Sequence, residues 1–377
     1  MNQQVQQSFL RSLLPTPQKI EFSDGDYYKL LDGSRFLLLG PEEIRQKALE
    51  ITAENAGTFW HFKLDIKFEA YSRSFPKEGY SIDIQADLVT ISASDISGFR
   101  FALYTLRQLA QSERKVKFYS CFILPQCKIE DYPTLEFRGI HLCWFPETSP
   151  VDIEKAIRLA AALKYNAVVL ESWGVFPFEC APDFYWKDKH VPKAVFAHLT
   201  KLSQKLGIEL IPQINITGHA SWSRGGSGKH AILSVSPQYE SLFEPCGWCW
   251  CLTNPETRKL LSEMISEIHE AYGNPPHFHI GCDEAHTLGT CCECAAHDTA
   301  EIFREHLVFF HDLLQKRGAQ TMLWHDMFLD KGNPVFEQFV RCGRKEFAEM
   351  LKDLPKDLLI CDWEYCGVTP PNTLDFE

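Results

Sequence analysis

The apolar and polar positions of residues 15–112 follow two periodicities. Residues 64–71 alternate apolar and polar side chains, as a half-buried strand does. Residues 97–111 have helical spacing, with one apolar face made by Phe101, Leu103, Tyr104, Leu106 and Leu109. The expected strands lie at residues 20–22, 35–39, 64–71, 79–84 and 88–92, and the expected helices at 42–56 and 97–111. Strands followed by one packed helix predict a small α+β domain.

A different pattern begins at residue 136, after an expected connector at residues 113–135. Residues 167–172 are an almost unbroken apolar run, typical of a strand that is buried on both faces. Expected strands lie at residues 136–144, 167–172, 209–215, 277–284, 321–327 and 358–365, and expected helices at 151–164, 193–206, 300–317 and 335–351, with another starting at Asn254-Pro255. Alternating strands and helices predict a parallel (β/α)8-type TIM barrel over residues 136–377.

This count gives six strands, whereas a closed barrel of this type has eight. Open sheet edges expose unpaired N–H and C=O groups, which invite association. We therefore expect the chain either to be a shortened form of a longer protein or to close its barrel by pairing with another chain. A homo-oligomer is one form that such pairing can take.

Composition and charge narrow the class of partner. The chain has 377 residues, 45% of them hydrophobic, and a formal net charge of -12. An acidic protein lacks the basic face that nucleic acids and anionic membranes require, so we expect neither partner. Residues 1–14 lack the features of a signal peptide, and no apolar run is long enough to span a membrane. We therefore expect a cytoplasmic protein whose 14 cysteines are mostly reduced thiols.

Polar and aromatic side chains collect where the predicted barrel strands end. Asp283 and Glu284 are adjacent carboxylates at the end of the strand expected at 277–284. The other strand ends contribute His141 and Trp144, Glu171 and Trp173, Gln213, Asn215 and His219, Trp324, His325 and Asp326, and Trp363, Glu364 and Tyr365. Aromatic faces beside carboxylates are typical of a sugar pocket. The alternative for the acidic pair is a helix N-terminus, with Asp283 as the cap and Glu284 in the first turn.

Several of these runs resemble a known family. The segment His279-Ile-Gly-Cys-Asp-Glu284 resembles the catalytic signature of family 20 glycoside hydrolases, the β-N-acetylhexosaminidases. Similar matches are Pro212-Gln-Ile-Asn-Ile-Thr-Gly-His219, Trp324-His-Asp326-Met and Trp363-Glu-Tyr365. The likeness is greatest to the hexosaminidase D branch, through Glu171 with Phe176-Pro177, Cys251-Leu-Thr-Asn-Pro255, and Gly281-Cys-Asp-Glu-Ala with Leu288-Gly289. The main branch has an aspartate and a sugar-binding arginine where this chain has Cys143 and Pro146.

The resemblance implies an exo-acting hydrolase that releases terminal β-linked N-acetylhexosamine from an oligosaccharide or glycoconjugate, with retention and without a cofactor. Glu284 is then the general acid, which needs a raised pKa, and Asp283 orients the substrate's own 2-acetamido group as nucleophile. Tyr365 holds the acetamido oxygen. The expected substrate-binding residues are Glu171, His219, Trp324, Asp326, Trp363, Tyr365 and His141.

Two alternatives stay open at this point. One is a carbohydrate-binding barrel without turnover, for which an acid beside an anion has no purpose. The other is a glycosidase for sugars that lack an acetamido group, in which Glu171 or Asp326 acts as nucleophile.

Cysteines are concentrated in two segments of the barrel. Cys246, Cys249 and Cys251 lie in one, and Cys291, Cys292, Cys294 and His297 lie just after the acidic pair. We expect no catalytic metal. A structural metal on Cys291, Cys294 and His297, completed from the first segment, is one interpretation, and a set of reduced loop thiols is the other.

Overall fold

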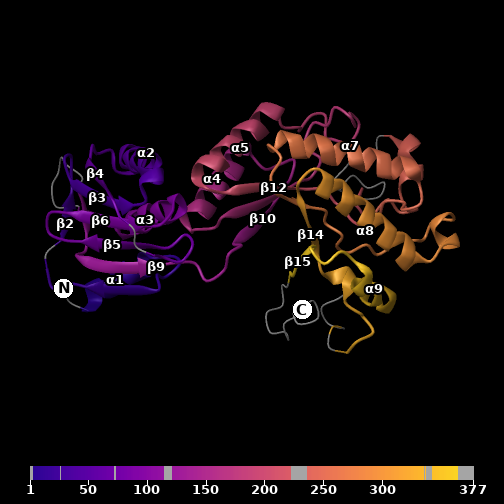
Figure 1. Ribbon diagram of the computed structural model, residues 1–377. Coiled ribbons are helices and arrows are strands. Elements are labelled where there is room, and N and C mark those ends of the chain that lie inside the picture. The colour runs from indigo at the N-terminus through magenta and orange to yellow at the C-terminus, as the bar shows by residue number, and fades with distance from the viewer. Residues whose placement is uncertain are drawn as a thin grey trace. The chain divides into compact units, whose positions relative to one another are not determined.

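A computed structural model describes residues 3–25, 27–71, 74–113, 121–221, 236–334, 336 and 342–363. The chain divides into two compact units (Figure 1). One comprises Met1–Arg138 with Arg158–Asn166, and the other comprises Gly139–Ile157 with Ala167–Glu377.

The first unit is built on a six-stranded sheet with the order β1-β9-β5-β6-β3-β4. β3 is parallel to both β4 and β6, and the other pairs in this sheet are antiparallel. Its elements are α1 (Gln3–Ser12), β1 (Lys19–Phe22), β2 (Tyr28–Leu30), β3 (Arg35–Gly40), α2 (Arg45–Asn55), β4 (Asp65–Ala70), β5 (Tyr80–Ile84), β6 (Val89–Ala93), α3 (Ile96–Leu109), β7 (Gln111–Glu113), β8 (Cys121–Leu124) and β9 (Cys127–Asp131).

Local sequence signals explain the main features of this unit. β5 alternates buried and half-buried residues and pairs with β6 as the expected hairpin, with Ile84 opposite Val89. The Asp95 side chain caps α3 by accepting the Gly98 N–H at 2.8 Å, and the apolar face of α3 is buried. Within residues 113–135, where we expected a connector, β9 pairs with β1 and β5 inside the main sheet. β8 joins β2 and β7 in a separate three-stranded sheet.

The second unit contains the predicted parallel sheet. Within the described residues its six strands pair in chain order, from β10 to β15, which is the order of neighbouring strands around a (β/α)8 barrel. The strands are β10 (Gly139–Trp144), β11 (Ala167–Ser172), β12 (Glu209–Gln213), β13 (His277–His279), β14 (Gln320–Trp324) and β15 (Leu359–Cys361). Parallel pairing brings the carboxyl ends of all these strands to one edge of the sheet.

Helices alternate with these strands along the chain, as expected. They are α4 (Pro150–Ala162), α5 (Lys193–Leu206), α7 (Pro255–Ala271), α8 (Thr299–Lys316) and α9 (Lys345–Met350). α5 packs against β12 and α8 against β14, and α7 lies between those two helices (Figure 1). The predicted cap at Asn254 is confirmed, since its side chain accepts the Glu256 N–H at 3.0 Å and Pro255 begins α7.

Several of the expected elements are shorter than the sequence pattern suggested. The strand expected at residues 277–284 stops at His279, because Gly281 and Cys282 adopt positive φ angles that no strand accommodates. Of the helix expected at residues 335–351, positions 335 and 337–341 lie outside the described residues, and the described part contains α9, Lys345–Met350. Within the described part of the chain, no helix combines the length and apolar character that a membrane crossing requires.

Candidate active site

The segment that follows β13 has an unusual backbone. Gly281, Cys282 and Glu284 have φ angles of 68°, 77° and 46°, and His219, in the loop after β12, has φ 53°. Positive φ is costly for residues other than glycine, and such strain clusters at functional sites. The two loops also lie very close together, since a Cβ on Gly218 would stand 2.3 Å from the Asp283 carbonyl oxygen. Tight packing therefore holds the acidic pair against His219.

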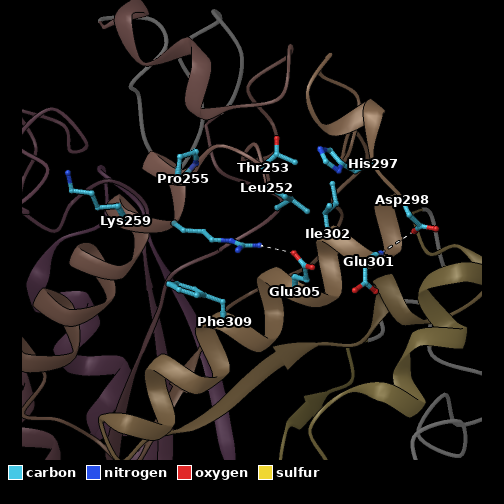
Figure 2. A pocket seen from close by; sticks show the side chains of 11 residues that line it. Leu252, Thr253, Pro255, Lys259, His297, Asp298, Glu301, Ile302, Glu305 and Phe309 are labelled. Atoms are coloured by element: carbon cyan, nitrogen blue, oxygen red, sulfur yellow. Dashed lines mark hydrogen bonds and ion pairs between the residues drawn. The ribbon is translucent and has the colours of Figure 1, made fainter.

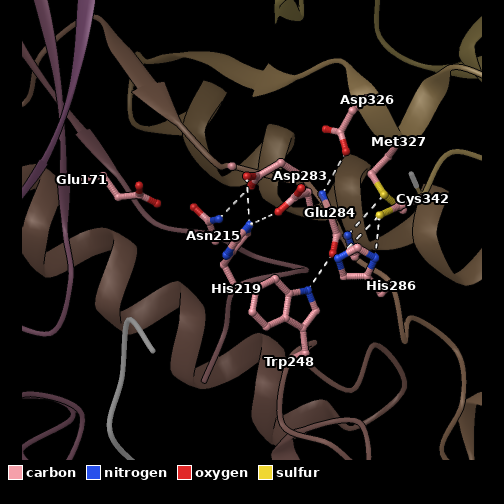
Figure 3. Close-up of polar contacts among 12 residues, drawn as sticks. Glu171, Asn215, His219, Trp248, Asp283, Glu284, His286, Asp326, Met327 and Cys342 are labelled. Atoms are coloured by element: carbon pink, nitrogen blue, oxygen red, sulfur yellow. Dashed lines mark hydrogen bonds and ion pairs between the residues drawn. The ribbon is translucent and has the colours of Figure 1, made fainter. Parts of the chain in front are cut away.

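His219 lies between the two carboxylates. Its Nε2 atom is 3.1 Å from Asp283 Oδ2 and 3.2 Å from Glu284 Oε2 (Figure 3). The hydrogen bond from His219 lowers the pKa of Glu284, against the opposing effect of burial. The raised pKa expected for Glu284 is therefore wrong for the protein without substrate. A single imidazole shared by two acids keeps Glu284 ionised in this state.

A chain of amide groups continues from Asp283 into the sheet. Asn215 Nδ2 donates to Asp283 Oδ1 at 3.0 Å, and Gln213 Nε2 donates to Asn215 Oδ1 at 2.9 Å. Gln213 Nε2 also donates to Glu171 Oε1 at 2.8 Å. Asn215, Gln213 and Glu171 are all buried, so these bonds fix the rotamers that the acidic pair depends on.

Glu171, on β11, connects this strand to β10 through His141 and Cys143 and to β12 through Gln213. Its Oε2 atom accepts the Trp173 indole N–H at 3.2 Å and the Cys143 thiol at 3.4 Å, and it lies 3.5 Å from His141 Nε2. Cys143 is the residue that replaces an aspartate of the resembled family. Its thiol donates to Glu171, where an aspartate would add a second negative charge beside a buried carboxylate.

Asp326 lies next to the acidic pair, two residues after the end of β14. Its Oδ2 atom accepts the backbone N–H of Glu284 at 3.0 Å, and the residue is buried, with 2% of its surface exposed. Burial, together with the negative charge of Asp283, raises the pKa of Asp326 to about 7. Asp326 thus positions the Glu284 backbone and titrates close to neutrality.

Trp248 forms a wall of the site that the sequence reasoning missed. Its indole N–H donates to the Glu284 carbonyl oxygen at 2.6 Å, and its ring centroid lies 4.3 Å from that of His219 (Figure 3). The indole N–H of Trp250 donates to the Asn215 carbonyl oxygen at 2.9 Å. In the sequence, only the closely spaced pair of tryptophans in Gly247-Trp248-Cys249-Trp250 could have indicated that this loop contributes to the site.

The structure describes two of the three remaining aromatic residues that we expected to bind substrate. The centroid of the Trp324 ring lies 4.4 Å from that of His279 and 5.2 Å from that of His141. Trp324 thus packs beside His141, which itself contacts Glu171. Trp363 donates its backbone N–H to His325 Nδ1 at 3.3 Å and packs against that ring. Tyr365 lies outside the described residues.

The cysteine segments also meet. Glu244, Cys251, Cys291 and Cys294 offer ligand atoms that all lie within 4.8 Å of one another. His297 is not in that group, and it lines a separate pocket between α7 and α8 with Thr253, Arg258 and Glu305 (Figure 2).

Comparison with known proteins identifies the family. Residues 11–132 match the family model described as "Glycosyl hydrolase family 20, domain 2", and residues 190–366 match "Glycosyl hydrolase family 20, catalytic domain". The chain belongs to glycoside hydrolase family 20. Both matches agree with the resemblance inferred from the sequence motifs.

Curated family 20 relatives have modest identity to this chain. It is 27% identical over 231 residues to β-hexosaminidase subunit beta of Entamoeba histolytica, which covers 56% of this chain and 39% of that protein. It is 25% identical over 220 residues to β-hexosaminidase subunit A1 of Dictyostelium discoideum, and this match covers 55% of this chain and 39% of that protein. The chain thus matches about two fifths of the length of each curated relative.

Solved family 20 structures share the fold. The exo-β-N-acetylglucosaminidase of Vibrio harveyi, in complex with N-acetylglucosamine, matches with a TM-score of 0.70 at 18% identity over 94% of this chain and 58% of that chain. The β-N-acetylhexosaminidase of Bacteroides fragilis matches with a TM-score of 0.68 at 20% identity, over 94% and 71%. These matches confirm the predicted fold class, a barrel preceded by a small α+β domain.

Proposed function

We propose that this chain is the catalytic part of an exo-acting β-N-acetylhexosaminidase that works by the retaining, substrate-assisted mechanism. The observation that carries the proposal is the contact of one imidazole, His219, with both Asp283 and Glu284. Two carboxylates held together suit a reaction in which one transfers a proton and the other stabilises a developing positive charge.

Glu284 is the proposed proton donor to the leaving glycosidic oxygen. In the free protein it is ionised, so it needs a proton before the first step. His219 Nε2, at 3.2 Å, is placed to supply it. A bound sugar excludes water and strengthens the burial effect that already acts to raise the pKa of Glu284. After cleavage, the Glu284 carboxylate takes a proton from the attacking water.

Asp283 is the proposed partner of the substrate's acetamido group. Asn215 and His219 hold its two oxygens from the protein side. The carboxylate accepts the amide N–H as the acetamido oxygen attacks the anomeric carbon, and it stabilises the positive charge of the oxazolinium. The negative charge is thus fixed before reaction, which is the condition for effective electrostatic stabilisation.

The sugar pocket is proposed to be made by the surrounding aromatic and acidic side chains. Trp248 and Trp324 offer ring faces, and Glu171, which is buried and already accepts hydrogen bonds from the protein, stays a prediction as an acceptor for a sugar hydroxyl. His141, Asp326, Trp363 and Tyr365 stay predictions as substrate-binding residues. Hydroxyl recognition through Glu171 would compensate for the arginine that Pro146 replaces.

Three finer assignments belong to the same proposal. Membership of the hexosaminidase D branch rests on the motifs around Phe176-Pro177 and Cys251-Leu-Thr-Asn-Pro255. A cytoplasmic location is supported by the cysteines of the described residues, which are free thiols. The edge strands β10 and β15 are proposed to be covered, by further strands or by a second copy, and the mass of the protein in solution tests this.

The test is a comparison of three nitrophenyl glycosides, the β-N-acetylglucosaminide, the β-N-acetylgalactosaminide and the β-glucoside, with Asp283→Asn as the matched control of low activity. Turnover of one or both acetamido sugars, without turnover of the glucoside, is the expected result. Binding without turnover would favour the carbohydrate-binding alternative, and turnover of the glucoside would favour a carboxylate nucleophile.

A further inference from the structure

Three cysteines and one glutamate converge from separate parts of the second unit. Glu244 and Cys251 come from the loop that precedes α7, whereas Cys291 and Cys294 flank a turn that leads into α8. Cys251 Sγ lies 3.7 Å from Cys291 Sγ and 3.6 Å from Cys294 Sγ. Residues 40 or more positions apart are thus brought to sulfur–sulfur contact.

The sulfur separations match those around a tetrahedral zinc ion. A Zn–S bond of about 2.3 Å places two tetrahedral thiolate ligands about 3.8 Å apart. A disulfide would join two of the sulfurs and leave the third thiol beside them, so it does not account for three sulfurs and a carboxylate within 4.8 Å. Cys291-x-x-Cys294 also has the ligand spacing common in structural zinc sites.

Backbone N–H groups are arranged to stabilise negative charge on these ligands. The Cys294 N–H donates to Cys291 Sγ at 3.3 Å. The Glu244 carboxylate accepts the N–H groups of Gly289, at 3.2 Å, Thr290, at 2.9 Å, and Cys291. Such outer hydrogen bonds orient metal ligands, and they offset the excess negative charge that three thiolates and a carboxylate leave on a divalent ion.

Burial separates this cluster from an ordinary set of loop thiols. Glu244 is 1% exposed, Cys251 3% and Cys294 0%, whereas Cys292, between the paired cysteines, is exposed. A buried carboxylate is costly unless a cation or strong hydrogen bonds compensate it. The N–H groups of Gly289, Thr290 and Cys291 supply part of that compensation for Glu244, and a divalent cation would add to it.

We propose that Cys251, Cys291 and Cys294 bind one zinc ion, with Glu244 as the fourth ligand. Four protein ligands fill a tetrahedral site, so the site is structural and leaves no position for a reacting water. This ligand set differs from the one suggested by sequence spacing in that Glu244 takes the place of His297, while Cys251 is the ligand from the first cysteine segment.

The ion would connect two loops that shape the candidate active site. The segment between Glu244 and Cys251 carries Trp248, whose indole N–H donates to the Glu284 carbonyl oxygen. The segment that ends at Cys291 follows Glu284 directly in the chain. Zinc therefore fixes Trp248 over His219 without contacting a reacting group.

The experiment is metal analysis of the purified protein, combined with X-ray absorption at the zinc edge. We expect one zinc ion per chain, with three sulfur neighbours and one oxygen neighbour. Chelation should release the ion and lower the melting temperature, and added zinc should restore it. A protein free of zinc after growth in zinc-supplemented medium, and not stabilised by added zinc, would overturn the proposal.

Matched variants assign the ligands. Cys251→Ser and Cys294→Ser should lose the zinc, and Glu244→Gln should weaken zinc affinity by about tenfold or more. Cys292→Ser, an exposed neighbour, should retain one zinc per chain. If the cysteine variants do not fold, cobalt substitution of the unaltered protein replaces them, with thiolate-to-cobalt absorption and intense tetrahedral bands expected. Full zinc retention by Cys251→Ser, absence of those bands, or a disulfide at Cys251 in non-reduced peptide maps would contradict the assignment.

Discussion

Each unit of the molecule contains a charged cluster built around carboxylates with little exposure to solvent, and the negative charge is neutralised differently in the two clusters. In the first unit, Asp131 Oδ2 accepts the Lys164 ammonium at 2.8 Å and the Tyr80 hydroxyl at 2.9 Å, with the Lys164 and Asp131 side chains only 7% and 8% exposed. In the second unit, Asp283 and Glu284 share one imidazole, and Asp326 lies next to them.

The nature of the cation distinguishes a cluster that stabilises the fold, which contains Lys164, from a cluster suited to catalysis, which contains His219. A lysine has an ordinary pKa far above neutrality, and although burial lowers the pKa of Lys164, Asp131 opposes that effect. A histidine changes charge near neutral pH, so its partners can be protonated in turn. One acid with one permanent cation stabilises the fold, whereas two acids that share one imidazole keep proton transfer possible.

Glu284→Gln should have the largest effect. Removal of the proton donor is expected to slow cleavage of substrates with poor leaving groups by about 10²–10⁴-fold. Aryl substrates with good leaving groups need less protonation and should lose much less activity. The ratio of kcat/KM for the two substrate types measures this, and an equal loss on both would remove Glu284 from the role of acid.

Lys164→Met should lower the stability of the folded protein. It leaves Asp131 buried without its cation, and we expect a loss of about 3–5 kcal/mol in the free energy of unfolding, measured by urea denaturation. Lys128→Met is the control, because the Lys128 side chain is 65% exposed and forms a surface ion pair with Asp83. That variant should change stability by less than about 1 kcal/mol. Similar losses in both variants would contradict a structural role for the buried pair.

Asp283→Asn should slow hydrolysis of N-acetylhexosaminides by about 10²–10³-fold, because the amide cannot stabilise the oxazolinium charge. A thiazoline mimic of that cyclised intermediate should inhibit the unaltered protein and bind the variant more weakly, as inhibition constants would reveal. Trapping of a covalent glycosyl-enzyme, with no binding of the mimic, would exclude acetamido participation.

Asp326→Asn should give a smaller effect that depends on pH. The folded protein keeps the Asp326 proton up to a pH of about 7, whereas the unfolded chain releases it near the ordinary value of 3.8. Between those values the folded state binds more protons, so the contribution of Asp326 to stability falls as pH rises. Relative to the unaltered protein, the variant should therefore gain stability from about pH 5 to about pH 8.

Unfolding curves at both pH values measure this difference. Asp312→Asn, which alters an exposed carboxyl on α8, should follow the unaltered protein at both. A constant difference between Asp326→Asn and the unaltered protein would mean that Asp326 does not retain its proton in the folded state.

The sequence predicted features that depend on local patterns. The Asn254-Pro255 helix start follows from capping chemistry, and the β5–β6 hairpin follows from alternation of apolar residues. Glu171, His219, Asp283 and Glu284 could be grouped in advance because parallel strands bring their carboxyl ends to one edge.

Features set by contacts between distant loops could not be predicted. The turn at Gly281 and Cys282, which ends β13 early, depends on the close approach of Asn215 and Gly218. The contact of Trp248 with Glu284 crosses 36 positions, and the effect of His219 on the pKa of Glu284 depends on side-chain placement. Periodicity carries no information about such contacts.

The measurement that tests the central claim most directly is turnover of aryl β-N-acetylhexosaminides with one, two or three fluorine atoms on the acetyl methyl group. Fluorine withdraws electrons from the acetamido oxygen and weakens it as a nucleophile. If that oxygen attacks the anomeric carbon, with Asp283 as its partner, kcat/KM should fall steeply with each added fluorine. Rates that do not change along the series would contradict the account and require a nucleophile supplied by the protein.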